Sequence, residues 1–188
     1  MRSTPPREPA DPSTVIVSRG QISRRVAELA QEIASDCGPQ ELTVVAILDG
    51  ALIFLADLVR RLPMPLVLVT VGVRSYRGRA VTAGPLEVHR GIHTDLAGRR
   101  VLIVDDIYDT GATLAAVMER VARHGPNSCR TCVLLRKRRD DEPAGPRPDF
   151  VGFDIPDVFV VGYGLDYDGR YRNLPDVVAL KRSEEGTS

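Results

Sequence analysis

Short apolar runs without polar alternation place the strongest limit on how this chain can fold. The first three are TVVAIL (43–48), LVLVTV (66–71) and VLIV (101–104), and TCVLL (131–135) and VFVV (158–161) follow later. Strands that are apolar on both faces are typical of parallel sheets, because helices cover both faces of such sheets. These runs therefore predict a buried, mainly parallel sheet.

Helical segments separate several of these runs. Apolar residues recur at helical spacing from about 21 to 36, and Gly38-Pro39 ends the pattern. Residues 51–62 form a second segment, which ends at Pro63, and residues 113–125 form a third, which ends at a glycine. The alternation of strands and helices predicts a doubly wound α/β domain.

The length of 188 residues suits one globular domain with a substantial core. The first dozen residues contain four prolines and almost no large apolar side chain, so we expect 1–13 to be a disordered tail and 14–188 to be a single domain. Residues 76–95 are rich in glycine and in small or polar residues, which is typical of a long hairpin or lid.

The charge balance and the cysteines exclude several classes of protein. Lysine plus arginine and aspartate plus glutamate both number 25, so we expect neither nucleic acid nor a membrane as a partner. No apolar run reaches membrane-spanning length, and no secretory signal is recognisable, so we expect a cytoplasmic protein. Three cysteines do not suit a disulfide framework, and we expect Cys129 and Cys132 to be buried thiols of a strand.

The stretch VLIVDDIYDTGATL (101–114) combines an apolar strand, three acids and a turn. Asp105 and Asp106 would lie at the carboxyl end of the strand, where open α/β sheets bind their ligands. The turn after Asp109 would place backbone N–H groups and the hydroxyls of Thr110 and Thr113 at the start of a helix, which favours a phosphate. The turn matches neither a Walker A loop nor a GxGxxG motif.

Three carboxylates beside a phosphate site need a function of their own, because they would repel a phosphate alone. They can accept hydrogen bonds from sugar hydroxyls, help to hold Mg²⁺ or move a proton. A ribose phosphate with a reactive anomeric carbon satisfies all of these roles. Helix capping is the simpler alternative, but it needs only one such residue, so we favour a ligand site.

The same stretch resembles the phosphoribosyl pyrophosphate (PRPP) motif of type I phosphoribosyltransferases. Further stretches narrow the resemblance to hypoxanthine-guanine phosphoribosyltransferases: ILDGALIFLADLVRRL (47–62), RSY (74–76), LLRKR (134–138) and, most specifically, PDFVGFDIPDVFVVGYGLDYDGRYRNL (148–174). The resemblance extends from about residue 18 to the end of the chain. It implies the type I fold, a doubly wound and mainly parallel sheet with a small hood and a mobile lid hairpin.

The resemblance also implies how PRPP is bound. Asp105 and Asp106 would accept hydrogen bonds from the ribose hydroxyls, and Arg172 would contact pyrophosphate. The 5′-phosphate would lie within the turn formed by Asp109, Thr110, Gly111, Ala112 and Thr113. Asp109 would in addition be the general base or acid at purine N7. Ser75 and Tyr76 would begin the mobile lid.

Leu48, Asp49 and Gly50 align with the pyrophosphate loop of the family. The backbone of this loop often contains a cis peptide bond before its second residue. Many members have lysine where this chain has Asp49, and a carboxylate there would repel pyrophosphate unless it turns away, pairs with an arginine or meets the metal. Backbone binding by Gly50 does not depend on that difference.

The purine residues follow from the same resemblance. Lys137 would donate to the 6-oxo group, Phe159 would stack on the base and the backbone of Val160 would contact the purine edge. Asp166 would be a Mg²⁺ ligand beside the purine, and Asp105 and Asp106 are further metal candidates. We expect Arg138 and Arg139, in the same charge run as Lys137, to be solvated.

The activity that the resemblance implies is purine salvage. PRPP and hypoxanthine or guanine would give IMP or GMP plus pyrophosphate, with Mg²⁺ as the cofactor and a homodimer or homotetramer as the assembly. A xanthine-preferring enzyme is one alternative, and a non-catalytic regulator that binds PRPP or a nucleotide is another. The joint presence of Asp109, Lys137 and Asp166 favours catalysis.

Overall fold

The computed structural model describes residues 12–75, 86–88, 92–139 and 145–180. Its elements are, in chain order, β1 (Pro12–Val17), α1 (Arg19–Cys37), β2 (Leu42–Leu48), α2 (Leu52–Val59), β3 (Leu66–Ser75), β4 (Leu86–Val88), β5 (Arg100–Tyr108), α3 (Ala112–Ala122), β6 (Ser128–Arg138), β7 (Phe150–Pro156), β8 (Val160–Val161) and β9 (Val177–Leu180). None of the helices in these ranges is both long enough and apolar enough to span a membrane.

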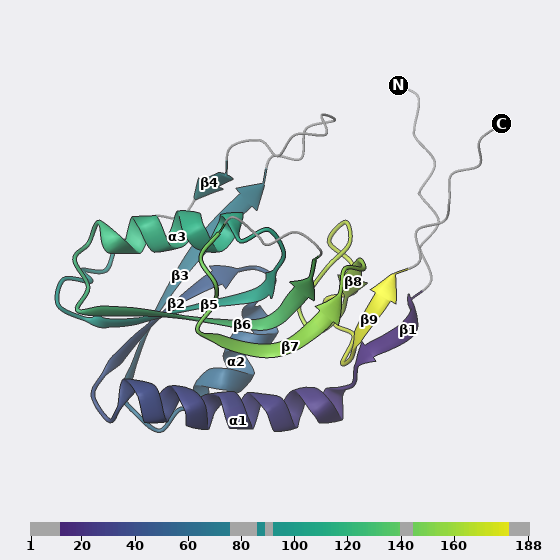
Figure 1. The fold of residues 1–188 in the computed structure, drawn as a ribbon, viewed down its shortest axis with the longest axis horizontal. Helices are drawn as coiled ribbons and strands as arrows, with labels where there is room; N and C mark the ends of the chain where they lie inside the picture. Colours follow the sequence, from purple (N-terminus) through teal and green to yellow (C-terminus); the bar gives the residue numbers. More distant parts are fainter. Residues whose placement is uncertain (1–11, 76–85, 89–91, 140–144, 181–188) are drawn as a thin grey trace.

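Six strands form the main sheet, in the order β4-β3-β2-β5-β6-β7. The strands from β3 to β7 are parallel, and β4 at one edge runs antiparallel to β3. Helices α1 and α2 lie on one face of this sheet, and α3 lies on the other (Figure 1). The predicted doubly wound α/β architecture is therefore confirmed.

Each face of the sheet has its own apolar core. On one face, Ile33 of α1 and Phe54 of α2 are fully buried in a cluster that includes Leu102 of β5. On the other face, Leu114 of α3 is buried in a cluster that includes Ile103. Successive residues of β5 thus serve opposite cores, which explains why this strand has no polar alternation.

A smaller antiparallel sheet, in the order β1-β9-β8, forms the expected hood. The prediction for 158–161 was wrong, because only Val160–Val161 form a strand, and that strand belongs to the hood. The edge of the main sheet beside β6 is occupied instead by β7. Most residues of β7 are only partly buried, so it lacks the continuous apolar character of the other parallel strands.

The ends of the chain and the lid are described only in part. Strand β1 begins at Pro12, so the last two residues of the expected tail belong to a strand, and residues 1–11 lie outside the described residues. Val73 of β3 pairs with Val88 of β4, as a hairpin requires. Tyr76 and most of the expected lid lie outside the described residues, and the mobility of the lid stays a prediction.

The cysteines are free thiols, as expected. Cys132 is buried in β6 and Cys129, in the same strand, is partly buried. Residues three apart in a strand point to opposite faces of the sheet, so these two thiols serve different environments. Burial raises the pKa of the Cys129 thiol to about 11, which makes this thiol unreactive at neutral pH.

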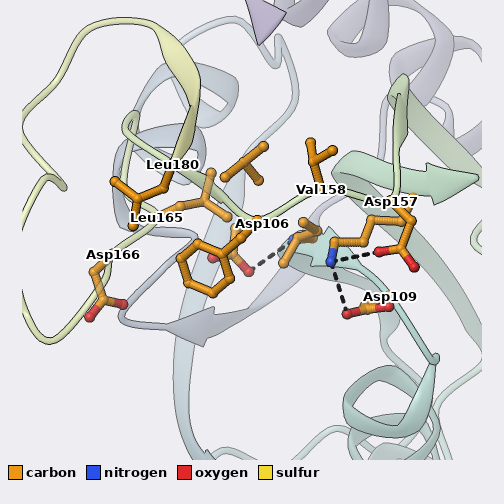
Figure 2. Close-up of a pocket in the computed structure, with 11 residues that line it drawn as sticks. Asp106, Asp109, Asp157, Val158, Leu165, Asp166 and Leu180 are labelled. Atoms are coloured by element: carbon orange, nitrogen blue, oxygen red, sulfur yellow. Dashed lines mark hydrogen bonds and ion pairs between the residues drawn. The ribbon is translucent and has the colours of Figure 1, made fainter. Parts of the chain in front are cut away.

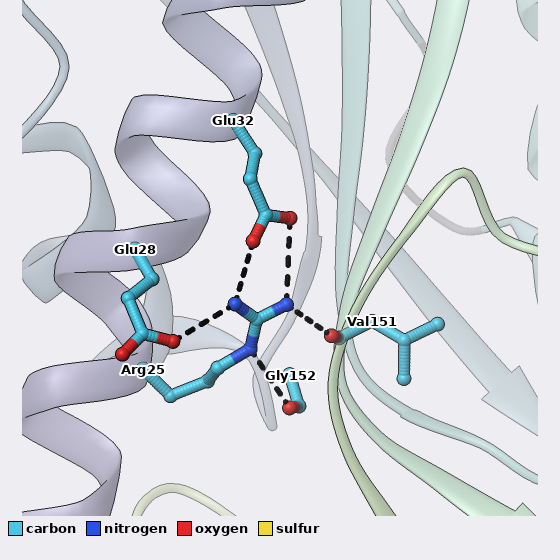
Figure 3. Close-up of polar contacts among 5 residues, drawn as sticks. All are labelled: Arg25, Glu28, Glu32, Val151 and Gly152. Atoms are coloured by element: carbon cyan, nitrogen blue, oxygen red, sulfur yellow. Dashed lines mark hydrogen bonds and ion pairs between the residues drawn. The ribbon is translucent and has the colours of Figure 1, made fainter.

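Arg25 links helix α1 to strand β7 (Figure 3). Its guanidinium donates to the carbonyl oxygens of Gly152 at 3.1 Å and Val151 at 3.0 Å. The same group bonds the carboxylates of Glu28 at 3.0 Å and Glu32 at 2.6 Å. Because backbone acceptors at a partly buried contact need a donor, this arrangement stabilises the packing of α1 more than an exposed ion pair would.

We predict that Arg25→Met lowers the free energy of unfolding by about 1–2 kcal/mol, because methionine fills much of the same space but leaves two carbonyl groups without their donor. Chemical denaturation measures the change. Arg123→Met is the control. The side chain of Arg123 pairs with Glu119, both side chains are exposed, and the loss of this pair costs about 0.5 kcal/mol or less. Equal losses in the two variants would contradict the role given to Arg25.

Candidate active site

The site lies at the carboxyl end of β5, beyond the point where β5 stops pairing with β2. β5 continues to Tyr108, so Asp105 and Asp106 lie within the strand and not after it, as its apolar run had suggested. The pairing between β2 and β5 ends at Ala46 and Val104, whereas the pairing between β5 and β6 continues to Tyr108. Beyond Val104 one side of β5 is therefore open, and this opening leads into the site.

Two cavities occupy this end of the sheet. The larger has a volume of about 680 Å³, and its lining includes Asp109, Lys137, Asp157, Phe159 and Val160. The smaller has a volume of about 300 Å³, and its lining includes Asp49, Gly50, Asp105, Thr113 and Arg172. Asp106, Ile107 and Asp166 line both cavities. The two cavities thus meet at a pair of carboxylates from different parts of the chain.

One side of the larger cavity is charged. The ammonium group of Lys137 lies 3.3 Å from Asp109 Oδ2 and 3.0 Å from Asp157 Oδ1 (Figure 2). Arg139 is exposed, as expected, and its Nη1 in addition lies 2.7 Å from Asp109 Oδ1. Its neighbour Arg138 is exposed, as expected. Asp109 therefore faces two cations from one strand end.

The other side of the larger cavity is apolar. Leu165 and Leu180 lie on the side away from Asp109 and Asp157 in Figure 2. The ring of Phe159 meets the ring of Tyr167 edge to face, with centroids 5.7 Å apart and an interplanar angle of 83°. A cavity with an apolar wall and a few polar groups at one edge suits a flat heteroaromatic ligand.

The loop after β2 forms one wall of the smaller cavity. Its Leu48–Asp49 peptide bond is cis, as the family resemblance implies. A Cβ atom at Gly50 would lie 1.7 Å from Asp106 Oδ2, so only glycine fits between this loop and β5. Gly164 is equally constrained, because its φ is +104° and a Cβ atom there would lie 2.2 Å from Gly50 O. The side chain of Asp49 is exposed.

The segment after β8 is bound to the rest of the site by side chains. Tyr163 Oη donates to Asp57 Oδ2 of α2 at 2.6 Å. Arg172 Nη1 donates to Gly164 O at 2.6 Å, and its Nη2 lies 2.9 Å from Asp166 Oδ1. Tyr163 thus ties this segment to α2, and Arg172 fixes Gly164 and Asp166 relative to each other within it.

The acids of β5 are held in an unfavourable environment. Asp105 Oδ1 accepts from Asp106 N at 3.0 Å, and Asp106 Oδ1 accepts from Ile107 N at 2.9 Å. Burial raises the pKa of Asp105 well above its ordinary value, and the adjacent Asp106 carboxylate raises it further. Burial also raises the pKa of Asp106. Two acids placed where ionisation is costly indicate a functional role, because the fold alone does not need them.

Helix α3 begins at the edge of the site. Gly111, with φ of +78°, is its N-cap residue and has no side chain that could cap the helix, while Thr110 Oγ1 accepts from Ala112 N at 3.4 Å. A Cβ atom at Gly111 would lie 2.8 Å from Tyr108 Oη and 3.0 Å from Gly145 Cα, so glycine is required for space as well as for φ. Since Thr113 lines the smaller cavity, the positive end of the helix reaches the place expected for a phosphate.

Most of the predicted site residues converge on these two cavities. Thr110 and Gly111 lie in the adjoining turn, and Ala112 is the first residue of α3. Ser75 is the last residue of β3, and its side chain is not among the described ones. Sequence reasoning missed Asp157, Arg139 and the apolar lining residues Val158, Leu165 and Leu180. Asp157 could have been found, because it precedes the Val158-Phe159 pair in the stretch that carries the most specific resemblance.

The fold and the two cavities define a type I phosphoribosyltransferase, and comparisons with known proteins agree. The family model of the phosphoribosyl transferase domain matches residues 15–168. The hypoxanthine-guanine phosphoribosyltransferase of Mycobacterium avium is 41% identical over 92% of this chain and 87% of its own. The chain belongs to the hypoxanthine-guanine phosphoribosyltransferase family.

Solved structures of the family have the same fold. A crystal structure of a hypoxanthine-guanine phosphoribosyltransferase from Bacillus anthracis has a TM-score of 0.81 and 34% identity, and the match covers 89% of this chain and 98% of that one. A hypoxanthine phosphoribosyltransferase variant from Trypanosoma cruzi, complexed with the product IMP, has a TM-score of 0.82 and 33% identity over 96% of this chain and 95% of that one.

We predict that Asp105→Asn stabilises the ligand-free protein by about 1–2 kcal/mol at neutral pH, because an amide of the same shape removes a buried charge. The raised pKa means that the folded state holds the proton more tightly than the unfolded state. The Asp105 contribution is therefore fully present below the unfolded pKa of about 4 and is lost as pH rises through the folded pKa. Thermal denaturation at pH 5 and pH 8 should show a larger gain at pH 8.

Asp154→Asn is the control for that measurement. A hydrogen bond from Arg136 lowers the pKa of Asp154, so its contribution has the opposite sign and is lost as pH falls. Asp154→Asn should therefore lose stability at neutral pH. A gain for Asp105→Asn that is the same at both pH values would contradict the explanation by buried charge.

Proposed function

We propose that this chain transfers the phosphoribosyl group of PRPP to N9 of hypoxanthine or guanine and releases IMP or GMP and pyrophosphate. The observation that best supports this reaction is the pair of cavities that meet at Asp106 and Asp166. The larger suits a purine ring, and the smaller suits a ribose with its phosphates. The relatives named above, among them a protein complexed with IMP, support the same substrates.

The charged side of the larger cavity would bind the polar edge of the purine. Lys137 would donate to the 6-oxo group, and a 6-amino purine would place a donor against the same ammonium group. Phe159 would stack on the ring and the backbone of Val160 would contact its edge. Asp109 would take or share the proton at N7 while the new bond forms at N9.

The smaller cavity would hold the ribose and pyrophosphate. Asp105 and Asp106 would accept hydrogen bonds from the ribose hydroxyls, and the turn from Asp109 to Thr113 would bind the 5′-phosphate at the start of α3. The backbone of Gly50 and the guanidinium of Arg172 would bind pyrophosphate, which would leave as negative charge develops on it. Asp49 is at the same cavity, and its role stays a prediction.

The carboxylates of the smaller cavity fit Mg²⁺, which prefers oxygen ligands and keeps waters or substrate phosphates among them. Within the described ranges no three His, Cys, Asp or Glu side chains are arranged to hold a metal ion by themselves. Asp166, with Asp105 and Asp106 as further candidates, would therefore hold Mg²⁺ together with the substrate. When bound, the ion would neutralise charge on pyrophosphate.

The reaction is tested by incubating the purified chain with PRPP, Mg²⁺ and each of hypoxanthine, guanine, xanthine and adenine. We expect IMP and GMP to form much faster than the product of adenine. Preference for xanthine would support the xanthine-specific alternative, and nucleotide binding without any turnover would support the regulatory one. A homodimer or homotetramer, and a cytoplasmic location, stay predictions.

We predict that Asp109→Asn lowers kcat with hypoxanthine by about a hundredfold or more, because the amide keeps the shape of the side chain but cannot accept the proton. The KM for PRPP should change by about twofold or less, since the helix start and backbone of the turn are retained. Steady-state kinetics with each substrate varied in turn separates the two parameters. Unchanged kcat would remove Asp109 from its proposed role.

A further inference from the structure

We propose, resting on the function proposed above, that Asp157 is a positioning residue that holds the Lys137 ammonium group at the purine edge and so sets the preference for 6-oxo over 6-amino purines. Asp157 lies directly after β7 and lines the larger cavity. Its Oδ1 atom lies 3.0 Å from Lys137 Nζ, which is closer than the 3.3 Å between Lys137 Nζ and Asp109 Oδ2.

The topology of the sheet places Lys137 between two acids. Strand β6 lies between β5 and β7, and Lys137 comes from its carboxyl end. Asp109 follows β5 and Asp157 follows β7, so the two carboxylates reach the ammonium group from different neighbouring strands (Figure 2). The Lys137 side chain is only 12% exposed. At such burial the direction of a flexible lysine side chain depends on the groups that its ammonium contacts.

Asp109 is unsuited to be the constant partner of Lys137. It is already paired with Arg139 at 2.7 Å. In the proposed reaction it also accepts a proton, so its attraction for Lys137 would change at the moment of bond formation. A partner that keeps its charge through the reaction is needed if the ammonium group is to stay on the 6-oxo group.

Asp157 meets this requirement. The hydrogen bond from Lys137 lowers the pKa of Asp157, and Arg139, whose Nη1 lies 3.7 Å from Asp157 Oδ2, acts in the same direction. Asp157 is therefore ionised at neutral pH in either protonation state of Asp109. It does not line the smaller cavity, so it has no direct part in binding the ribose or pyrophosphate.

The consequence of neutralising Asp157 follows from the distances. Without the charge of Asp157, Asp109 would attract the Lys137 ammonium group more strongly than residue 157 does, and the ammonium group would shift toward Asp109. Such a shift takes the donor away from the 6-oxo group and also covers the proposed base. Purine affinity and purine selectivity should therefore fall together, while affinity for PRPP is retained.

The experiment compares wild-type protein with Asp157→Asn. We expect the KM for hypoxanthine to rise about tenfold, in line with the loss of a charge-assisted hydrogen bond, and the KM for PRPP to change by about twofold or less. The ratio of kcat/KM for hypoxanthine to that for adenine should fall. Because Asp157 is 44% exposed, the substitution should not prevent folding, and thermal denaturation checks this.

Asp154→Asn is the matched control. Asp154 lies on β7 itself and bonds Arg136 at 2.6 and 3.0 Å, but neither cavity is lined by it. Its loss should leave the KM for hypoxanthine and the purine preference at wild-type values. An equal change in both variants would show a general effect of β7 and overturn the role of Asp157.

A double-mutant cycle with Lys137→Met tests whether Asp157 acts through Lys137. In the Lys137→Met background, Asp157→Asn should have almost no further effect on the KM for hypoxanthine. Independent effects, an unchanged KM in Asp157→Asn, or a selective loss of PRPP affinity would each overturn the proposal. Absence of IMP formation by wild-type protein would instead overturn the proposed function, and calorimetric binding of IMP would then provide the same cycle without turnover.

Discussion

The site depends on one close contact, in which the loop after β2 lies against the acidic end of β5 with no room for a side chain. A Cβ atom at Gly50 would collide with the Asp106 carboxylate, and a Cβ atom at Gly164 would collide with the Gly50 carbonyl. Three segments that are far apart in the sequence therefore meet backbone to backbone or backbone to carboxylate. This meeting point is also the boundary between the two cavities, so a larger residue there would disturb the base side and the phosphate side together.

The contact exists only because the sheet pairs unevenly at this end. β5 loses its partner β2 after Val104 but keeps its partner β6 as far as Tyr108. The stretch of β5 beyond its pairing with β2 contains Asp105 and Asp106, whose ionisation is disfavoured by burial. The rest of the domain supplies the stability that such a site costs, through separate apolar cores on the two faces of the sheet and through contacts such as that of Arg25 with β7. The two acids therefore lower the stability of the ligand-free fold when they are ionised, which indicates that they are retained for the site and not for folding.

Much of this arrangement could be predicted from the sequence, where local pattern and tertiary structure agree. Helix α1 has strong helical periodicity, and strands β2 and β5 have continuous apolar runs. The acids that follow the apolar run of β5 indicate a ligand site by their position before an anion-binding turn. The prediction that 158–161 forms a strand of the parallel sheet was wrong, because a run of four apolar residues does not show whether it belongs to the main sheet or to the hood. Strand β7 was missed because its edge position leaves it partly exposed. Arg139 and Asp157 were missed because only the side-by-side order of β5, β6 and β7 brings them to Asp109 and Lys137.

That order has a further consequence for how such a site distinguishes its ligands. The charged groups of the larger cavity come from the carboxyl ends of three neighbouring parallel strands, β5, β6 and β7. Asp109 and Asp157, which follow the outer two strands, both lie beside the basic side chains Lys137 and Arg139 at the end of β6. Side chains alternate between the faces of a strand, so a shift of one residue in the pairing of β6 would turn Lys137 away from the cavity and bring Arg136 or Arg138 into its place. The register of the sheet, which is fixed by the two apolar cores beneath and above it, therefore determines the charge pattern that a purine would meet. Apolar packing far from the cavity therefore determines which charged side chains are available to recognise a ligand within it.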